Sequence, residues 1–387
     1  MKYFMKPMVM AAAISFIAGG AIASTPGIST NTILFGQTAA LDGPAGALGR
    51  GMQLGLNAAF KEINDAGGVH GRMLEIISYD DGYEPDRAID NTNRLIDEDG
   101  VFALIGAVGT PTSKATQPIA TEKKVPFIGP FTGAGFLRQW ENNNVINIRA
   151  TYDQETETWI EHLTTDLGLT NIAILYQDDA FGRVGLSGVN KAMVKRGLKI
   201  SAEGTYPRNT TAVKKAFLSI RKAKPQAVVM VGAYKPIAAF IKLARKSGMD
   251  AVFVNISFVG SKALSNELGD QGAGVVVTQV VPFPWDDSKP VVADYQKALK
   301  VFDSSAELGF VSLEGYIVGR LAIVALQKAG RNVTRHSFLD TIYKTGNFDF
   351  GGAHLQYGDG DNQGMSDVFL TVIQADGSFK SVDILTD

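Results

Sequence analysis

Two loops of small and hydroxyl-bearing residues have the composition of a site for a small ligand. The first loop (109–112) follows the apolar run 101–105, and the second (129–133) follows the apolar run 125–128. A helix-length segment separates them, so 106–133 predicts a strand–loop–helix–strand–loop unit. Both loops then lie at the C-terminal edge of a parallel sheet, where small ligands bind in open α/β folds. Threonine hydroxyls and backbone N–H groups in such loops are available as hydrogen-bond donors to a ligand.

Acidic residues in two other loops are expected to have structural roles and not to form a catalytic or metal site. Asp80 and Asp81 are adjacent at a strand end, so their side chains point in different directions, and we expect helix capping and a turn rather than a catalytic pair. The run 359–364 hints at a calcium loop. Gln363 is a poor ligand there, and Leu370 stands where a bidentate acid is needed, so a plain turn is predicted.

Signatures of catalysis and of cofactor binding are missing from the sequence. The histidines are scattered without an i,i+4 pair: His70, His162, His336 and His354. The first strand is not followed by G-x-G-x-x-G, and neither a Walker pattern nor a G-x-S-x-G elbow is present. We therefore expect a protein that is not an enzyme, with no catalytic residues, metal or cofactor.

The first 23 residues have the features of a secretory signal peptide. Lys2 and Lys6 form a basic region, 8–22 is apolar, and 21–23 reads Ala-Ile-Ala, a small-residue cleavage motif. This apolar core is shorter than the roughly 20 residues that span a bilayer. No later stretch is expected to be long and apolar enough to do so. The pattern predicts export to the periplasm.

Composition and charge narrow the class of the mature protein. The 387-residue chain is 45% hydrophobic and 20% charged, which is ordinary for a soluble protein of about two domains. Without the signal peptide, the chain contains 35 basic and 39 acidic side chains and has no long basic run. This argues against nucleic acid as a partner. The absence of cysteine excludes disulfides, so stability must come from burial.

Strand-like and helix-like segments alternate along the chain in two series. In the first series, strands are predicted at 33–36, 73–78, 101–105 and 125–128, and helices at 49–64 and 87–98. In the second, strands are predicted at 172–176, 199–204, 227–231, 252–254 and 275–281, with helices at 154–166, 184–196, 213–222 and 237–247. Alternation of this kind predicts parallel sheets covered by helices on both faces. Helices at 314–329 and 337–345 and a β-rich tail complete a two-lobe body with several chain crossings.

Several strand-end loops, taken in order, resemble those of the type I periplasmic binding proteins. The first half contains LDGPAGALG, NDAGGVHGR, YDDGYEP, IGAVGTPTS and VPFIGPFTG, and the second half matches at 172–182, 228–236 and 253–261. Within that family the chain looks most like the Leu/Ile/Val-binding group that serves ABC importers. The resemblance runs from about Thr32 to the end and implies an α/β fold of two doubly wound parallel-sheet lobes. Three crossing strands would join the lobes, with a ligand cleft between them.

The family resemblance also implies lobe boundaries and binding positions. Lobe one would comprise 31–149 and 283–345, and lobe two 150–282 and 346–387. The resemblance implies that the Thr110 hydroxyl and the second-loop residues Phe131, Thr132 and Gly133 bind the ligand's carboxylate, for which hydroxyl and backbone N–H groups are preorganised donors. It also implies contacts from Leu48 beside the ligand's side chain and from Phe181 and Tyr234 across the cleft. The amino-acid binders often have a tyrosine where this chain has Phe181.

Ser257 is the most informative departure from the amino-acid binders, which place a glutamate there against the ligand's ammonium group. A buried ammonium group without a carboxylate partner is costly. Either Asp178 or Asp179 supplies the charge, or the ligand has no α-ammonium group. Phe131 and Phe181 favour a ligand with an aliphatic or aromatic body.

Two tyrosines are further candidates on positional grounds. Tyr83 stands in a loop that either reaches the cleft edge or stays outside it, and Tyr152 either packs at the hinge or touches the ligand. The resemblance implies a monomeric periplasmic receptor that delivers an amino acid or related small carboxylate to an ABC permease in the inner membrane. The alternatives are a binding protein that signals to a membrane receptor, and a binder of aliphatic or aromatic acids.

Overall fold

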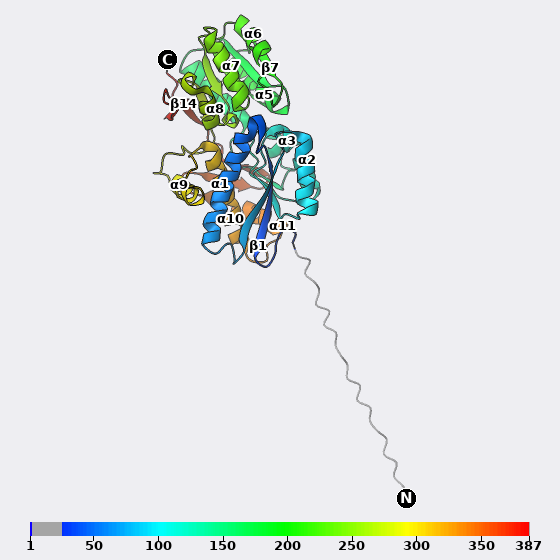
Figure 1. The fold of residues 1–387 in the computed structure, drawn as a ribbon. Coiled ribbons are helices and arrows are strands. Elements are labelled where there is room, and N and C mark those ends of the chain that lie inside the picture. Colours follow the sequence, from blue (N-terminus) through cyan, green and yellow to red (C-terminus); the bar gives the residue numbers. More distant parts are fainter. Residues whose placement is uncertain (2–24, 387) are drawn as a thin grey trace.

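The computed structural model describes Met1 and residues 25–386, so the predicted signal peptide lies, apart from Met1, outside the described residues. Two lobes, each built on its own sheet, make up the body of the protein (Figure 1). The sheet of the first lobe has the order β2-β1-β3-β4-β5 and is parallel throughout. Its strands are β1 (Thr32–Ala39), β2 (Met73–Asp80), β3 (Ala103–Ile105), β4 (Phe127–Ile128) and β5 (Val145–Ile146).

The second lobe contains a seven-stranded sheet in the order β15-β14-β10-β9-β8-β6-β7. Its parallel strands are β6 (Ile172–Gln177), β7 (Glu203–Tyr206), β8 (Ala227–Val231), β9 (Val252–Asn255) and β10 (Val276–Gln279). Two further strands, β14 (Phe369–Ile373) and β15 (Phe379–Val382), pair antiparallel and close one edge. The predicted strand at 199–204 lies a few residues later, at β7.

Helices connect consecutive parallel strands in both lobes, as the alternating sequence pattern predicts. In the first lobe they are α1 (Gly46–Asp65), α2 (Pro85–Asn93) and α3 (Thr110–Glu122). In the second they are α4 (Tyr152–Thr165), α5 (Ala180–Lys195), α6 (Lys214–Lys222), α7 (Tyr234–Lys246) and α8 (Ser261–Leu268). The predicted α/β class with two parallel-sheet lobes is confirmed.

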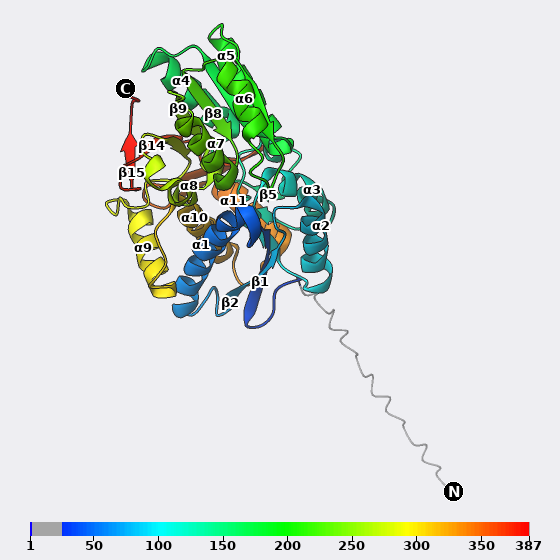
Figure 2. The same cartoon turned by 45° about the horizontal axis from the view of Figure 1, so that its top comes forward.

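After β10 the chain returns to the first lobe. It forms α9 (Pro290–Phe302), α10 (Phe310–Ala329), α11 (Arg335–Thr345) and a small sheet of β11 (Asn347–Asp349), β12 (His354–Gly358) and β13 (Asp361–Gly364). Figure 2 shows α9 and α10 beside α1. The first residue of α10, Phe310, also packs against Phe379 of β15 in the second sheet, with ring centres 5.7 Å apart. The small sheet contacts the first lobe as well, since the Asn147 N–H donates to the Asn362 carbonyl over 2.9 Å.

The division of the chain between the lobes stays a prediction. The predicted return to lobe two at 346 precedes β11, whereas the hydrogen bonds of β12 and β13 reach Asn147 in the first lobe. These contacts favour a final crossing near 364, after β13. From there, β14 and β15 join the second sheet.

α10 is the central helix of the first lobe. Its 20 residues are long and apolar enough to cross a membrane by length and composition alone, so the expectation that no such stretch follows the signal peptide was wrong. Most of its apolar stretch is buried inside the lobe, as in the core helix of a soluble protein. It approaches α1 closely because glycines face the contact: a Cβ on Gly55 would lie 1.9 Å from the Ser312 carbonyl oxygen.

Candidate functional site

The two loops predicted to form an anion grip meet at the C-terminal edge of the first sheet. The Phe131 N–H donates to the Ala107 carbonyl over 2.7 Å, and Val108 pairs with Phe131 in a parallel bridge. The Oγ1 atoms of Thr110 and Thr132 lie 2.6 Å apart, and both side chains are buried. Thr110 is the first residue of α3, so it stands where backbone N–H groups and the helix dipole favour an anion.

Gly109 allows the first loop to turn into α3. Its φ of 107° lies in the region that favours glycine, and a Cβ there would lie 2.2 Å from the ring of Tyr83. Tyr83 is buried, and its hydroxyl accepts a hydrogen bond from Gln177 of β6 over 3.4 Å. Tyr83 therefore contacts both the first loop and the second lobe.

Tyr152 begins α4, at the point where the chain enters the second lobe. Its ring packs against the second loop, since a Cβ on Gly133 would lie 2.6 Å from it. The buried Tyr152 hydroxyl has no hydrogen-bond partner among residues 25–386. Burial raises the pKa of Tyr152, although Arg149 and the hydroxyls of Thr132 and Thr110 act to lower it. The group is thus a neutral hydroxyl that makes no hydrogen bond within this part of the chain, although the hydroxyls of Thr110 and Thr132 lie near it.

A buried ion pair stands beside this hydroxyl. Arg149, 1% exposed, donates through Nε and Nη2 to the two carboxylate oxygens of Glu314 on α10, over 2.8 and 2.7 Å. Its Nη1 donates to Ser257 Oγ over 3.1 Å, and its guanidinium lies 4.0 Å from the centre of the Phe131 ring. Burial alone would lower the pKa of Arg149, but Glu314 raises it above its usual range, so the guanidinium stays charged.

A second buried carboxylate, Glu155 of α4, lies on the far side of Ser257. It accepts from the Ser257 N–H over 2.8 Å, from Ser257 Oγ over 2.8 Å, and from Thr278 Oγ1 over 2.5 Å. Burial raises the pKa of Glu155, while Arg149 and these donors act to lower it. Every polar atom of the Ser257 side chain and its N–H is therefore bonded to protein groups.

The two acids predicted as alternative ammonium partners are both engaged elsewhere. Asp179 caps α5 by accepting from the Phe181 N–H over 3.0 Å, and it also accepts from Gln177 and Arg208 over 2.6 and 3.2 Å. Asp178 pairs with Arg183 at the surface, where its side chain is 48% exposed. Neither aspartate presents a free carboxylate to the site.

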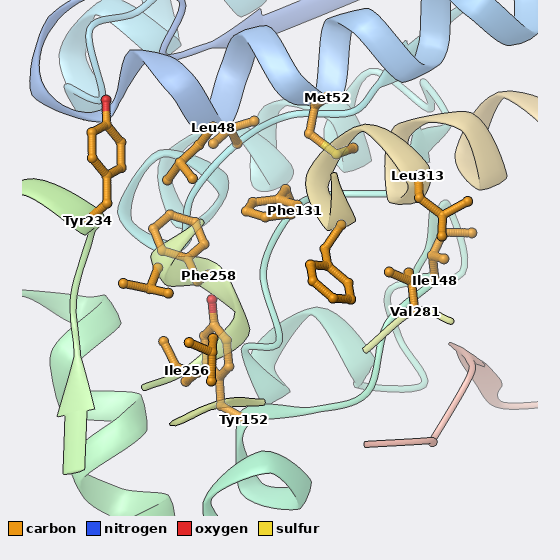
Figure 3. Close-up of a cluster of buried hydrophobic side chains, with 14 of the residues drawn as sticks. Leu48, Met52, Phe131, Ile148, Tyr152, Tyr234, Ile256, Phe258, Val281 and Leu313 are labelled. Atoms are coloured by element: carbon orange, nitrogen blue, oxygen red, sulfur yellow. The ribbon is translucent and has the colours of Figure 1, made fainter. Parts of the chain in front are cut away.

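Aromatic rings fill the space between these polar groups. Phe258 lies in the short helix Ser257–Val259 of the second lobe, and its ring centre is 4.6 Å from that of Phe181 and 5.4 Å from that of Phe131. Tyr83 is 5.9 Å away. Figure 3 shows Phe258 below Leu48 of α1 and beside Phe131, so a side chain of the second lobe enters the first. Sequence reasoning did not single out Phe258.

Contacts near Leu48 complete the boundary between the lobes. The Ala47 N–H donates to the Tyr234 hydroxyl over 3.3 Å, which joins α1 to α7. A cavity of about 200 Å³ lies next to Leu48, between α1, α8 and the segment 307–312. A larger hollow of about 760 Å³ lies on the first lobe around Trp140 and Tyr343, away from every predicted binding residue.

All the predicted binding residues are buried at the boundary of the lobes: Leu48, Tyr83, Thr110, Phe131, Thr132, Gly133, Tyr152, Phe181, Tyr234 and Ser257. The structure links them through the contacts above, while their role as ligand contacts stays a prediction. Three charged residues of the site were missed: Arg149, Glu155 and Glu314. Arg149 stands three residues before Tyr152, but nothing in its local sequence marks it as buried.

The loop at Asp80 and Asp81 and the loop at 359–364, for which turns were predicted, both contain turns. Asp80 Oδ1 accepts from the N–H groups of Leu41, Asp42 and Gly82, and Asp81 Oδ1 accepts from that of Tyr83. Residues 359–364 include the turn between β12 and β13. Within residues 25–386, no cluster of three or more histidine, aspartate or glutamate side chains is placed to hold a metal ion.

Comparison with known proteins gives relatives over most of the chain. A family model described as periplasmic binding protein matches residues 32–378. The leucine-, isoleucine-, valine-, threonine-, and alanine-binding protein of Pseudomonas aeruginosa is 24% identical over 303 residues, 78% of this chain and 80% of that protein.

Solved structures agree with this match. A possible leucine/isoleucine/valine-binding protein from Rhodopirellula baltica SH 1 is 38% identical, with a TM-score of 0.87 over 92% of this chain and 98% of that one. A substrate-binding periplasmic protein from Ralstonia solanacearum is 27% identical, with a TM-score of 0.86 over 90% of this chain and 100% of that one. These relatives are described as binding proteins, not enzymes. The chain belongs to the periplasmic binding protein family, as a type I member similar to the Leu/Ile/Val-binding proteins.

Proposed function

We propose that this protein is an exported, non-enzymatic receptor of an ABC importer that binds an amino acid or a related small carboxylate between its lobes. The observation that carries the proposal is the buried Tyr152 hydroxyl without a partner, beside the paired hydroxyls of Thr110 and Thr132. An unsatisfied buried donor costs about 1–3 kcal/mol. A ligand carboxylate that accepts from it removes this cost.

The surroundings of these hydroxyls suit a carboxylate. Thr110 begins a 13-residue helix, whose N-terminal N–H groups and dipole attract an anion. The apolar body of the ligand would lie among Phe131, Phe181 and Phe258, or in the cavity beside Leu48. The names of the Pseudomonas aeruginosa and Rhodopirellula baltica relatives, which refer to branched-chain amino acids, support a ligand of this size and polarity.

Binding would require the lobes to separate and close again. All ten candidate contacts are buried, so a ligand reaches them only when the lobes move apart about their crossing segments. The closed, monomeric form would then be the one presented to an ABC permease at the inner membrane.

Thermal unfolding of the mature protein with a panel of small carboxylates tests the proposal. The panel contains L-leucine, L-valine and L-phenylalanine, aliphatic and aromatic acids, and methylamine as a solute without a carboxylate. We expect at least one carboxylate to raise the Tm in a concentration-dependent manner, since a ligand bound only to the folded state stabilises it. Methylamine should have no effect. If no small carboxylate shifts the Tm, the proposal is wrong.

The matched variant Thr110→Val keeps the shape of the side chain and removes its hydroxyl. We expect it to weaken binding of the active carboxylate about tenfold, the equivalent of one lost hydrogen bond to a charged group. Thr341→Val is the control, because Thr341 bonds only within α11, far from the lobe boundary. The Thr341→Val variant should bind the active carboxylate with the same affinity as the wild type.

A further inference from the structure

We infer that the bound carboxylate carries no α-ammonium group, because the Arg149 guanidinium already places a cation at the polar side of the site. This inference rests on the proposed function and names its substrate class. It follows from the charge and hydrogen bonding of Arg149, Ser257 and the acids around them.

Arg149 is held at the lobe boundary by partners from both lobes. Glu314 belongs to α10 of the first lobe, and Ser257 to the second. These partners use three of the five N–H bonds of the guanidinium, which leaves donors for a ligand oxygen. Phe131 covers one face of the group at 4.0 Å, so the charge is little screened by water.

An ammonium group needs a carboxylate acceptor, and the acids near the site are committed to protein donors. Glu314 accepts two N–H bonds from Arg149, and Glu155 accepts three hydrogen bonds from Ser257 and Thr278. Asp179 caps α5 and bonds Gln177 and Arg208.

Glu155 is the acid that a ligand cation would most easily approach through Ser257. Burial raises its pKa, which favours the neutral form and weakens its attraction for a cation. An ammonium group placed against Ser257 would instead stand next to Arg149, whose Nη1 is 3.1 Å from Ser257 Oγ. The two like charges would repel in this buried place, and the Glu314 carboxylate, already bonded to Arg149, offsets only part of that repulsion. An oxygen or an apolar group is accepted there without that cost.

Isothermal titration of the mature protein with matched ligand sets tests the inference. One set is L-leucine, 4-methylpentanoate and 4-methyl-2-oxopentanoate, and the other is L-phenylalanine, 3-phenylpropanoate and phenylpyruvate. Within the set that fits the site, we expect the members without an ammonium group to bind at least tenfold more tightly than the amino acid. If the amino acid binds equally well or better, the inference is wrong while the proposed function stands. If no member of either set binds and no carboxylate of the wider panel raises the Tm, both fail.

A double variant tests whether Arg149 causes the discrimination against ligands with an α-ammonium group. Arg149→Met with Glu314→Met replaces the buried ion pair by apolar side chains, which proteins often tolerate, whereas Arg149→Met alone leaves Glu314 buried and unpaired. We expect the double variant to reduce the preference for the ligand without an ammonium group over the matching amino acid at least fivefold. The matched control, Arg320→Met with Glu62→Met, removes a half-buried pair elsewhere in the first lobe and should leave that preference unchanged. An unchanged preference in a folded Arg149→Met/Glu314→Met protein would overturn the role of Arg149.

Discussion

The polar side chains buried between the lobes are of two kinds. Arg149, Glu314, Glu155 and Ser257 are hydrogen-bonded to one another, which fixes the arrangement of their charges. The Tyr152 hydroxyl is different, because it is buried without a partner among residues 25–386. A network of hydrogen-bonded charges sets which ligands are accepted, whereas an unsatisfied donor gains a bond when a ligand binds.

Tyr152→Phe separates stability from binding at this position. Removing a buried hydroxyl without a partner should leave the ligand-free free energy of unfolding unchanged or raise it by about 1 kcal/mol. The same change should weaken binding of the active carboxylate about tenfold. Urea unfolding and titration calorimetry measure the two effects. Loss of stability with unchanged affinity would show that the hydroxyl has a structural partner instead.

Asp81 should make stability depend on pH. Burial is the largest effect on this carboxyl and raises its pKa from 3.8 to about 7, although the Tyr83 N–H and the Thr38 hydroxyl oppose the shift. Between pH 4 and 7 the folded protein keeps a proton that the unfolded chain releases. Its contribution is therefore fully present below pH 3.8 and is lost as pH rises through 7, by at most about 1.4 kcal/mol per pH unit.

Asp81→Asn isolates this contribution, because other titrating groups are common to both proteins. The difference in free energy of unfolding, wild type minus Asp81→Asn, should fall between pH 5 and pH 8 and then level off. Urea unfolding at several pH values measures it. A difference that stays constant over this range would contradict the raised pKa of Asp81.

At the scale of elements, the α1–α10 contact supports the half of the site that belongs to the first lobe. α1 carries Leu48 and α10 carries Glu314, so a shift between the helices moves both. The backbones approach closely because Gly55 and Gly315 face each other's helix: a Cβ on Gly315 would lie 2.4 Å from the Met52 carbonyl oxygen. Such contacts with backbone atoms cannot relax by a side-chain rotation.

Gly55→Ala should therefore destabilise the protein, by about 2–4 kcal/mol, as expected for overpacking against backbone. Thermal unfolding should show a clear loss of Tm. Gly135→Ala is the matched control, since a Cβ there meets no atom within 4 Å and the residue does not require positive φ. Equal Tm values for the two variants would mean that α1 and α10 are further apart than described.

At the scale of the whole molecule, a small group of partly exposed polar contacts joins the two lobes around Glu84 and Arg208. Glu84 of the first lobe accepts from Arg208 over 2.6 Å and from Asn209 over 2.7 Å in the second. The Gly82 carbonyl accepts from Asn209 over 2.9 Å. Because these groups are partly exposed, their contribution to closure is modest.

Glu84→Ala should shift the equilibrium toward the open form. We expect ligand affinity to fall about fivefold, mainly through faster dissociation, and the radius of gyration of the ligand-free protein to increase in X-ray scattering. Asp65→Ala, which removes an exposed ion pair with Lys61 inside α1, should change neither quantity. If Glu84→Ala leaves scattering and affinity unchanged, these contacts do not control closure.

The local features of this protein are predictable from its amino-acid sequence. Apolar runs followed by small-residue loops located most strands and the two loops that meet at Thr110 and Thr132, because those signals depend on neighbouring residues alone. The order of the loops indicated the family. The antiparallel edge formed by β14 and β15 was not foreseen, since strand pairing depends on segments far apart in the chain.

The charged groups of the site can be recognised only in the folded protein. Arg149 and Glu314 are 165 residues apart, and Glu155 is 102 residues from Ser257. In sequence, each charged residue looks like one exposed on a helix or at a strand end, and Phe258 looks like an ordinary core residue. Folding brings them together where little water remains, and burial makes their pairing strong. The two loops can be recognised from neighbouring residues alone. The proposed exclusion of a ligand ammonium group, in contrast, depends on contacts between residues far apart in the chain.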